Sequence, residues 1–353
     1  MATLTRLERA ILALSVATTA LAGIARYAHW TAILAFVLAT LALAALAWTV
    51  SFATSGVGER LGPAATGFLQ ATVANLPEVF VVIFALNAGE VVVAQTSILG
   101  SLFANALLLL GIVIVVGARR ASDGIMRFHP RLPNDTATLL LATVFIIVLV
   151  GLSLASHDPA SRHVSAISGV GAVCLLGVYV AWAVPYLRGG GAEPARPGQG
   201  PGLGLAAALV LLLAAGAGAA FVSDWFVHAL RPTIGRLHLS QAFAGLVIVA
   251  IAGNAVENVA AIVLAARGRS ELAIAVVKNS VAQIAAFLFP LVVLCSLPFA
   301  TSLTFSLAPV YIGALLLMAV AVWQITGDGE ATVFEGLALM ALYVILAAVT
   351  IYE

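Results

Sequence analysis

The sequence predicts an all-α polytopic membrane protein with about eleven transmembrane helices. Hydrophobic residues make up 63% of the 353 positions and charged residues only 9%, a composition that a water-soluble domain would hardly carry. Apolar segments of about twenty residues, the length that spans a bilayer, recur along nearly the whole chain. The net charge of +1 gives no reason to expect a nucleic-acid partner, so the expected surrounding is lipid.

The predicted helices follow the apolar segments in order. They cover residues 7–25, 31–53, 62–88, 91–117, 136–156, 164–187, 203–227, 240–266, 271–298, 304–325 and 332–352. The first follows Arg6 and Arg9, as a signal peptide would, but its cleavage pattern is weak and a second apolar run comes soon after, so we expect a retained helix. The stretch RGGGAEPARPGQGPG, residues 188–202, predicts a flexible linker. Cys174 and Cys295 lie in apolar runs and are expected in the core.

The arginines predict the orientation, because loops on the cytoplasmic side carry an excess of basic residues. With the N-terminus in the cytoplasm, the inner loops hold eleven arginines: Arg6, Arg9, Arg60, Arg119, Arg120, Arg127, Arg131, Arg188, Arg196, Arg267 and Arg269. The outer loops then hold four: Arg26, Arg162, Arg231 and Arg236. Eleven spans place Glu353 outside, and we expect the cell (inner) membrane.

An internal repeat with opposite orientation is predicted from two segments at an offset of 179 positions (257 − 78 = 179). When the two segments are aligned at this offset without a gap, the same residue type occurs at four pairs of positions: Asn75 and Asn254, Glu78 and Glu257, Gly89 and Gly268, Ser101 and Ser280. The two glutamates are five helices apart, so the copies enter the membrane from opposite sides, as in secondary transporters. The predicted organisation is an extra helix at 1–28, a first repeat at 29–187, the linker at 188–202 and a second repeat at 203–353.

Glu78 and Glu257 each lie inside an apolar run, and the repeat predicts that they meet near mid-membrane. A charged carboxylate at the bilayer centre costs at least about 2.5 kcal/mol, and two facing carboxylates repel each other. Such a pair becomes stable by binding a cation or by taking up protons. Because cation and protons compete for the same oxygens, alternating access would make the site an antiporter. The alternative is a structural pair bonded to neighbouring backbone.

A hard cation such as Ca²⁺ requires about six to eight oxygen ligands. Side chains near the carboxylates that can supply some of them are Asn75, Asn254, Ser101, Asn105, Ser280 and Gln283. Pro77 and Gly253 favour helix breaks that line a cavity, although the alternatives are a simple kink and a packing contact. Ser97, Ser101 and Ser280 could instead bond back to the preceding turn.

The same residues carry a resemblance to a known family. The segment ERLGPAATGFLQATVANLPEVFVVIFALNAGEVVVAQTSILGSLFANALLLLG resembles the first signature repeat of the calcium/proton exchangers, in the cation/calcium exchanger superfamily. AFAGLVIVAIAGNAVENVAAIVLA resembles the second repeat, and GDGEATVFEGLALMALYVILA resembles the last helix. The similarity covers about residues 51–351. It implies eleven helices, with one extra at the start and two inverted five-helix repeats, and exchange of cytoplasmic Ca²⁺ for protons.

The resemblance also implies residue roles. The family's site glutamates fall on Glu78 and Glu257, and its signature asparagines fall on Asn75 and Asn254. Other polar positions of the two repeats match Gln95, Ser101, Asn105 and Gln283.

Three departures from the family pattern affect the expected site. The usual Gly-Asn-Ala-Thr-Glu is Ala-Asn-Leu-Pro-Glu at 74–78, an ending that resembles the sodium/calcium exchangers. Asn258 replaces the usual histidine, so a titrating partner is missing. The usual Gly-Ser-Ser-Thr-Gln run begins with Asn279 and reads NSVAQ at 279–283, which loses two hydroxyls.

Lys278, the only lysine in the chain, is the strongest departure. If it were charged and close to the site, two carboxylates and one ammonium would sum to −1, and Ca²⁺ would leave an unfavourable excess of +1. Three interpretations stay open here. Lys278 snorkels away from the site, or it is neutral when cation is bound and carries a proton otherwise, or the protein has left calcium transport.

The sequence therefore predicts a secondary active cation/proton antiporter, most simply a Ca²⁺/H⁺ exchanger that needs no cofactor. The alternatives are an exchanger for Na⁺, K⁺ or Mn²⁺, because Lys278 and Asn258 alter the site, and a transport-inactive or channel-like homologue. No metalloprotease, hydrolase or aspartate-rich diphosphate motif is present, so an enzyme is not expected.

Overall fold

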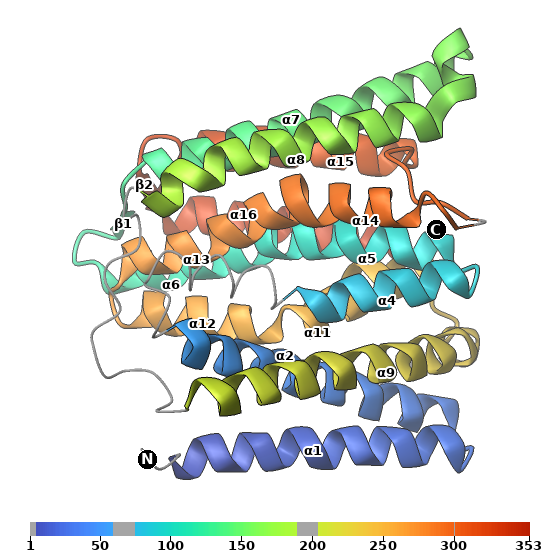
Figure 1. Cartoon of the computed structure of the whole chain (residues 1–353). Helices are drawn as coiled ribbons and strands as arrows, with labels where there is room; N and C mark the ends of the chain where they lie inside the picture. The colour runs from blue at the N-terminus through green and yellow to red at the C-terminus, as the bar shows by residue number, and fades with distance from the viewer. Residues whose placement is uncertain (1–4, 59–74, 189–203, 300) are drawn as a thin grey trace. The chain divides into compact units, whose positions relative to one another are not determined.

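The computed structural model describes residues 5–58, 75–188, 204–299 and 301–353, and helices make up most of it (Figure 1). The chain divides into two compact units. Unit 1 consists of Met1–Ala88 and Val180–Leu239, and unit 2 consists of Gly89–Tyr179 and Ser240–Glu353. Each unit therefore combines segments from both halves of the sequence.

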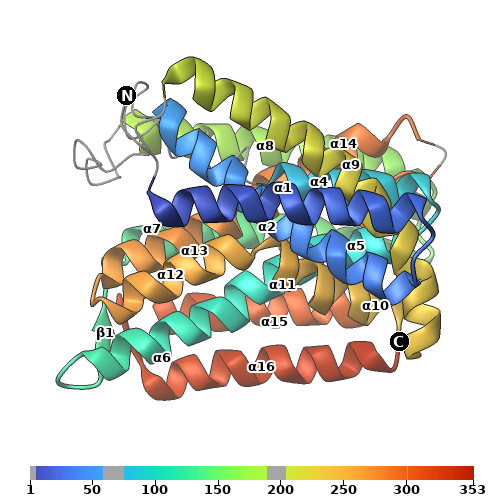
Figure 2. The same cartoon turned by 90° about the horizontal axis from the view of Figure 1, so that it is seen from below.

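Unit 1 is built around two long helices from opposite halves of the chain, α2 and α9, which pack along each other. Helix α1 packs mainly on α2, and α4 packs on α9 (Figure 2). The rings of Phe36 and Phe226 meet 4.9 Å apart in the α2–α9 interface. The elements are α1 (Arg6–Tyr27), α2 (Ala32–Gly58), α4 (Leu76–Asn87) and α9 (Leu205–Leu237).

Unit 2 holds the remaining elements, of which α8 crosses its boundary. The first part contains α5 (Val91–Phe103), η1 (Ala104–Leu109), α6 (Leu110–Arg120), β1 (Ile125–Arg127), α7 (Arg131–Ser156), η2 (Pro159–His163) and α8 (Val164–Arg188). The second part contains α10 (Gln241–Phe243), η3 (Ala244–Val249), α11 (Ala250–Gly253), α12 (Ala255–Ala266), α13 (Ser270–Gln283), η4 (Ile284–Leu288), α14 (Phe289–Ser296), α15 (Pro309–Thr326), β2 (Glu330–Thr332) and α16 (Val333–Ile351).

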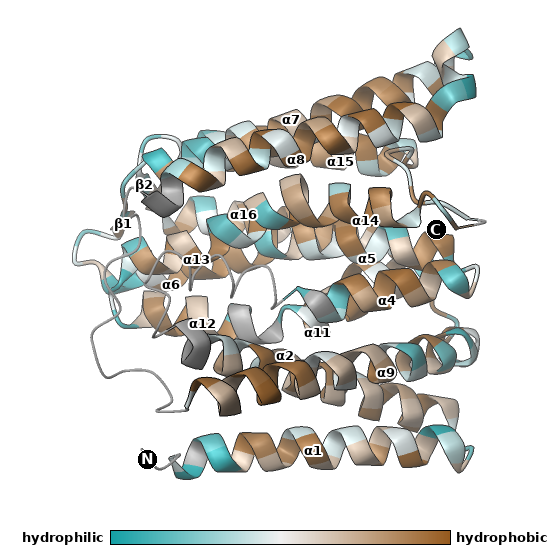
Figure 3. Cartoon of the chain, viewed as in Figure 1, coloured by the Kyte–Doolittle hydropathy of each residue, from teal (hydrophilic) through white to brown (hydrophobic). Residues whose placement is uncertain are grey.

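The helices have the length and polarity of membrane spans. Within the described residues, nine are long and apolar enough to cross a bilayer, or ten if the bent pair Gln241–Gly253 and Asn258–Ala266 is one span. Most of their residues are hydrophobic, and hydrophilic residues gather near helix ends and loops (Figure 3). Of the predicted span at 62–88, residues 62–74 lie outside the described part. The all-α membrane class is confirmed, and the count of eleven stays a prediction.

Two turns related by the offset of 179 have the same backbone. Gly89 and Gly268 occupy the left-handed region at φ 77° and 72°, which glycine enters without steric cost. The next residues, Glu90 and Arg269, are the N-caps of α5 and α13, with φ, ψ of −87°, 62° and −92°, 63°. The local geometry thus repeats even where the side chain changes from an acid to a base.

The close packing of α5 on η3 depends on glycine. A Cβ on Gly100 would lie 2.3 Å from the carbonyl oxygen of Leu246, far inside van der Waals contact. The two segments therefore approach through bare backbone, which brings the polar side chains that follow them within hydrogen-bonding distance.

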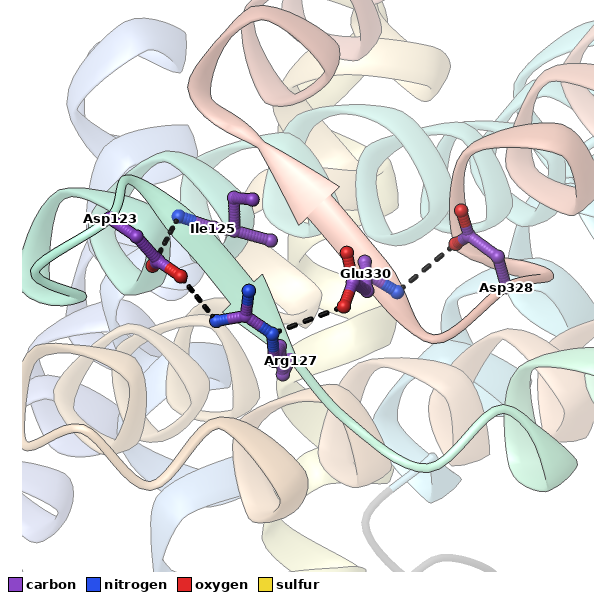
Figure 4. A network of polar contacts seen from close by, with 5 residues as sticks. All are labelled: Asp123, Ile125, Arg127, Asp328 and Glu330. Carbon is purple, nitrogen blue, oxygen red and sulfur yellow. Dashed lines mark hydrogen bonds and ion pairs between the residues drawn. The ribbon is translucent and has the colours of Figure 1, made fainter.

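A short antiparallel pair of strands, not predicted from the sequence, joins two loops of unit 2. Strand β1 pairs with β2 in the register Ile125↔Thr332. Arg127 bridges them, donating to Asp123 at 2.6 Å and to Glu330 at 3.1 Å (Figure 4). The Arg127 guanidinium holds the pKa of Asp123 below its ordinary value.

The prediction that the cysteines lie in the core is wrong, since Cys174 and Cys295 are both exposed. A membrane helix is apolar on its lipid-facing side as well as in its core, so an apolar run does not identify the buried face.

Candidate functional site

The centre of the candidate site in unit 2 is a helix break at Asn254. This residue ends α11 and begins α12, with φ, ψ of −96°, 7°, and the two arms are bent by 59°. Its side-chain amide donates to the Ser101 hydroxyl at 2.9 Å and to the Ala250 carbonyl at 2.8 Å. Its side-chain oxygen accepts from the Asn105 amide at 3.0 Å. Asn254, Ser101 and Asn105, called here the Asn254 cluster, are all buried.

The Asn254 cluster leaves a buried oxygen available. The Asn105 amide group donates to both Asn254 and the Ser101 carbonyl, but among the described residues its Oδ1 atom accepts no hydrogen bond. One turn after Asn254, the buried Oδ1 of Asn258 likewise has no partner in the described part of the chain. A buried acceptor without a donor is costly. Such oxygens fit a cation that takes amide carbonyls as ligands.

Three π-helical segments flank these residues. η3 leads into α11 and the break, η1 begins three residues after Ser101 and contains Asn105, and η4 follows Gln283. A π-helical turn shifts the hydrogen-bond register by one residue and is frequent at functional sites. The backbone of unit 2 is thus irregular at all three places where the predicted polar residues lie.

Helix α13 carries the polar residues of the second repeat. Ser280 and Gln283 are buried and lie within one turn of each other, and Asn279 lies beside Ser280 on the same helix. The Gln283 side chain forms a hydrogen bond with the hydroxyl of Tyr179 on α8. The predicted positions are therefore buried and polar, as a transport site requires.

Lys278 points away from this polar side. At about 100° per residue it lies about 160° from Ser280 and about 140° from Gln283 around α13. Its side chain is 0% exposed, and its Nζ donates to Thr326 Oγ1 on α15 at 2.8 Å. The interpretation that Lys278 snorkels away from the site agrees with this position in direction, but Thr326 holds the Nζ atom inside the protein rather than at the membrane surface. Its partner at the offset of 179 is Leu99 (278 − 179 = 99), which is also fully buried.

The side chains of Gln95 and Ser97 bond backbone carbonyls outside the Asn254 cluster. The Gln95 amide donates to the Ser306 carbonyl at 3.1 Å and so fixes the loop before α15. The Ser97 hydroxyl bonds back to the Val93 carbonyl at 2.6 Å, as the alternative interpretation of the serines expected. Neither contact joins the Asn254 cluster.

In unit 1, the Asn75–Glu78 segment repeats the geometry of the Asn254 break. Asn75 is the N-cap of α4, with φ, ψ of −84°, 0°, and its carbonyl accepts from the Val79 amide at 3.1 Å. The Asn254 carbonyl accepts in the same way from the Asn258 amide at 3.0 Å. Glu78 lies in the first turn of α4 and is half-buried, and the Ser223 hydroxyl of α9 donates to the Pro77 carbonyl at 3.5 Å.

The structure brings some of the predicted residues together. Ser101, Asn105 and Asn254 form one hydrogen-bonded cluster, whereas Glu78 and Asn75 belong to unit 1. Glu257 falls in α12, but its side chain lies outside the described part. Its predicted meeting with Glu78 stays a prediction. Across the described residues no group of three or more His, Cys, Asp and Glu side chains could hold a metal, so the described oxygens come from amides and hydroxyls.

Two partners were missed in the sequence. Tyr179 bonds Gln283 and Thr326 bonds Lys278. Tyr179 lies well inside its apolar run rather than at the membrane interface, where tyrosines gather, and that position is a usable signal. Thr326 carries no such signal, because threonines in helices commonly bond the preceding turn.

Comparison with known proteins assigns the chain to a family. The model of the sodium/calcium exchanger protein family matches residues 31–184 and 207–352. The chain belongs to the sodium/calcium exchanger protein family. Its members are multi-pass membrane transporters and not enzymes, which agrees with the apolar helices described above.

Relatives within this exchanger family match almost end to end. The chain is 30% identical to the Ca²⁺/H⁺ antiporter ChaA of Bacillus subtilis over 90% of this chain and 92% of that protein. It is 30% identical to the vacuolar calcium ion transporter of Schizosaccharomyces pombe over 93% of this chain and 82% of the relative. The solved structure of the Ca²⁺/H⁺ antiporter protein YfkE is 26% identical, with a TM-score of 0.80 over 97% of this chain and 100% of that one.

Proposed function

We propose that this exchanger moves Ca²⁺ outward in exchange for protons, by alternating access and without a cofactor. The observation that carries the proposal is the Asn254 cluster at a helix break, where a buried amide oxygen of Asn105 accepts no hydrogen bond within the described part. Relatives of similar length that are named for Ca²⁺/H⁺ exchange support the same cargo.

The charge of the proposed site explains coupling. Asn254, Ser101 and Asn105 are neutral, so the two negative charges come from Glu78 and Glu257. One Ca²⁺ or two protons cancel them, and both loaded forms are neutral. The empty site would carry two charges through a medium of low dielectric, which is strongly unfavourable. Conformational exchange is therefore expected only when the site holds Ca²⁺ or protons, and this requirement produces antiport.

The proposed organisation is two inverted repeats, at 29–187 and 203–353, with an extra helix at 1–28 and a linker at 188–202. The matching geometry of Asn75 and Asn254 and of the turns at Gly89 and Gly268 supports the duplication. In each copy an asparagine is the N-cap of a helix and a glutamate follows three residues later. We place the N-terminus in the cytoplasm and the C-terminus outside the cell (inner) membrane, as the arginines favour.

A second candidate is exchange of another cation, such as Na⁺, K⁺ or Mn²⁺. Asn258, in place of a titrating side chain, favours it. Lys278 argues for it less than the sequence suggested, because its Nζ bonds Thr326 on the far side of α13 from Ser280. A positive charge adjacent to the cation is therefore not part of the described geometry, and Ca²⁺ stays the first choice.

Uptake into proteoliposomes under an imposed pH gradient tests the proposal, with Ca²⁺, Mn²⁺, Na⁺ and K⁺ supplied in turn. We expect Ca²⁺ uptake that depends on the proton gradient and disappears in Glu78→Gln and Glu257→Gln. Preference for a monovalent ion would favour the second candidate. Flux that needs no proton gradient would indicate a channel, and no flux for any ion would indicate a transport-inactive homologue.

A further inference from the structure

An apolar crevice of about 740 Å³ lies between α1, α2 and α9, wholly within unit 1. Small residues on facing helices create the space, among them Ala20, Ala214 and Gly218. The rings of Tyr27 and Trp225, 6.0 Å apart in an edge-to-face arrangement, border it near the end of α1. No acidic or basic residue lines it, and no residue of the Asn254 cluster takes part.

Two shielded polar atoms lie along the crevice face of α1. Thr19 lines the crevice, and its buried Oγ1 has no hydrogen-bond partner among the described residues. Arg26 follows seven residues later, about two helical turns, and therefore lies on the same face. The Arg26 Nε is also buried and without a partner in the described part. Its guanidinium carbon lies 6.0 Å from the centre of the Tyr27 ring.

The position of Arg26 matches the level of a lipid headgroup. Helix α1 has 22 residues, about 33 Å, close to the thickness of a bilayer core of about 30 Å. Arg26 and Tyr27 at its end therefore lie near the membrane surface, where tyrosine and tryptophan favour the headgroup region. An arginine there binds phosphate through paired N–H groups.

We propose that this crevice binds one acyl chain of an anionic phospholipid whose phosphate contacts Arg26. An apolar crevice at membrane depth is filled by hydrocarbon, and an unpaired guanidinium donor at its end selects a negative headgroup. A second copy of the chain is the competing occupant. The lining offers no carboxylate to Arg26, and the acid of α1 itself, Glu8, lies at the other end of the helix, so copies in one orientation would not pair the two.

The test measures lipid retained by the purified full-length protein. After delipidation, phosphatidylglycerol or phosphatidylcholine is added and bound lipid is counted by native mass spectrometry. Ala214→Leu fills the crevice. Ala217→Leu makes the same change one turn later on α9, at an exposed position that does not line it. Arg26→Gln removes the phosphate ligand and leaves the walls intact. Melting temperatures verify that each variant is folded.

We expect one phosphatidylglycerol per chain, retained about tenfold better than phosphatidylcholine, in the wild type and in Ala217→Leu. Ala214→Leu should lose both lipids, and Arg26→Gln should bind both equally. A wild type without bound lipid, or Ala214→Leu that retains lipid as well as Ala217→Leu does, would overturn the site. An unchanged preference in Arg26→Gln would overturn the headgroup assignment. Dimers cross-linked through α1 would show that a second copy fills the crevice instead.

Discussion

The Asn254 amide lies 2.9 Å from the Ser101 hydroxyl, and this contact ties the break between α11 and α12 to α5. The bond joins residues that are 153 positions apart and belong to different halves of the proposed repeat. Asn105 adds a second bond to Asn254 at 3.0 Å. A broken helix in a membrane needs such partners, because its exposed polar groups have no water to bond. The cluster thus stabilises the break and leaves the buried Asn105 Oδ1 without a donor among the described residues.

Ser101→Ala should weaken exchange, whereas Ser97→Ala should not. Ser101 accepts from Asn254, and its removal leaves a buried donor unpaired at a cost of about 1–3 kcal/mol. We expect kcat/KM for Ca²⁺ to fall about tenfold or more. Ser97, one turn earlier on α5 and also buried, bonds only its own helix in the contacts described, which makes it the matched control. Proteoliposome uptake at several Ca²⁺ concentrations measures kcat/KM for both variants. An equal loss in the two variants would contradict a specific role of the Asn254 cluster in transport.

Asn258→His should make the apparent Ca²⁺ affinity depend on pH. Asn258 follows Asn254 by one turn, and its backbone N–H donates to the backbone carbonyl of Asn254 at 3.0 Å. A histidine there would gain a positive charge as the pH falls below about 6.5 and would repel the cation. We expect KM for Ca²⁺ to rise in that range beyond the wild-type change. Asn258→Gln is the control, and a histidine variant with the same pH profile as the glutamine variant would exclude a position near the cation.

The sequence predicts the part of this structure that has strong one-dimensional signals. Apolar segments of span length predict the helices, and Asn-x-x-Glu at one offset predicts the repeat whose asparagines are the N-caps of α4 and α12. The strands β1 and β2 were not predicted, because three-residue strands about 200 residues apart have no local pattern. The side of α13 that Lys278 faces was also left open. Lys278 and the polar residues Ser280 and Gln283 lie on different sides of α13, so the pattern alone does not tell which side faces which neighbour, and the packing of α13 on α12 and α7 decides it.

The pair Arg127 and Asp123 should contribute to stability at neutral pH and not in acid. Arg127 keeps the pKa of Asp123 below its ordinary value of 3.8 in the folded protein. The pair therefore adds its full stabilisation when the pH is above that ordinary pKa. The stabilisation disappears as the pH falls through the lower pKa of the folded state. The melting temperature of Arg127→Gln should therefore lie slightly below that of the wild type from about pH 5 to 7, and the gap should close toward about pH 3. High salt should also narrow it, because both side chains are exposed.

The matched control for this pair is Arg120→Gln, which removes an arginine from the exposed end of α6 without touching the strand pair. The difference in melting temperature between Arg120→Gln and the wild type should not change with pH. A gap for Arg127→Gln that widens below about pH 4 would contradict the assigned direction, since it would require Asp123 to be stabilised in its protonated form.

Lys278 and Thr326 should behave as a coupled pair that supports the fold without selecting the cation. Thr326 Oγ1 donates to the Val322 carbonyl at 2.6 Å and accepts from Lys278 Nζ. Thr326→Val therefore strands a buried amine, at a cost of about 1–3 kcal/mol. Lys278→Met replaces the amine with an apolar chain of similar length and should be nearly neutral or stabilising. Adding Thr326→Val to Lys278→Met should then cost less than it does in the wild type.

Melting temperatures of the four proteins in this cycle measure the coupling, and proteoliposome uptake measures the cation. Because Lys278 lies across α13 from Ser280, Lys278→Met should leave the preference for Ca²⁺ over Na⁺ and K⁺ and the pH optimum within about twofold of the wild type. A change in either would mean that the ammonium reaches the cation during transport. That result would favour the monovalent exchanger over the Ca²⁺ exchanger, because two carboxylates and one ammonium sum to −1, which one monovalent cation neutralises.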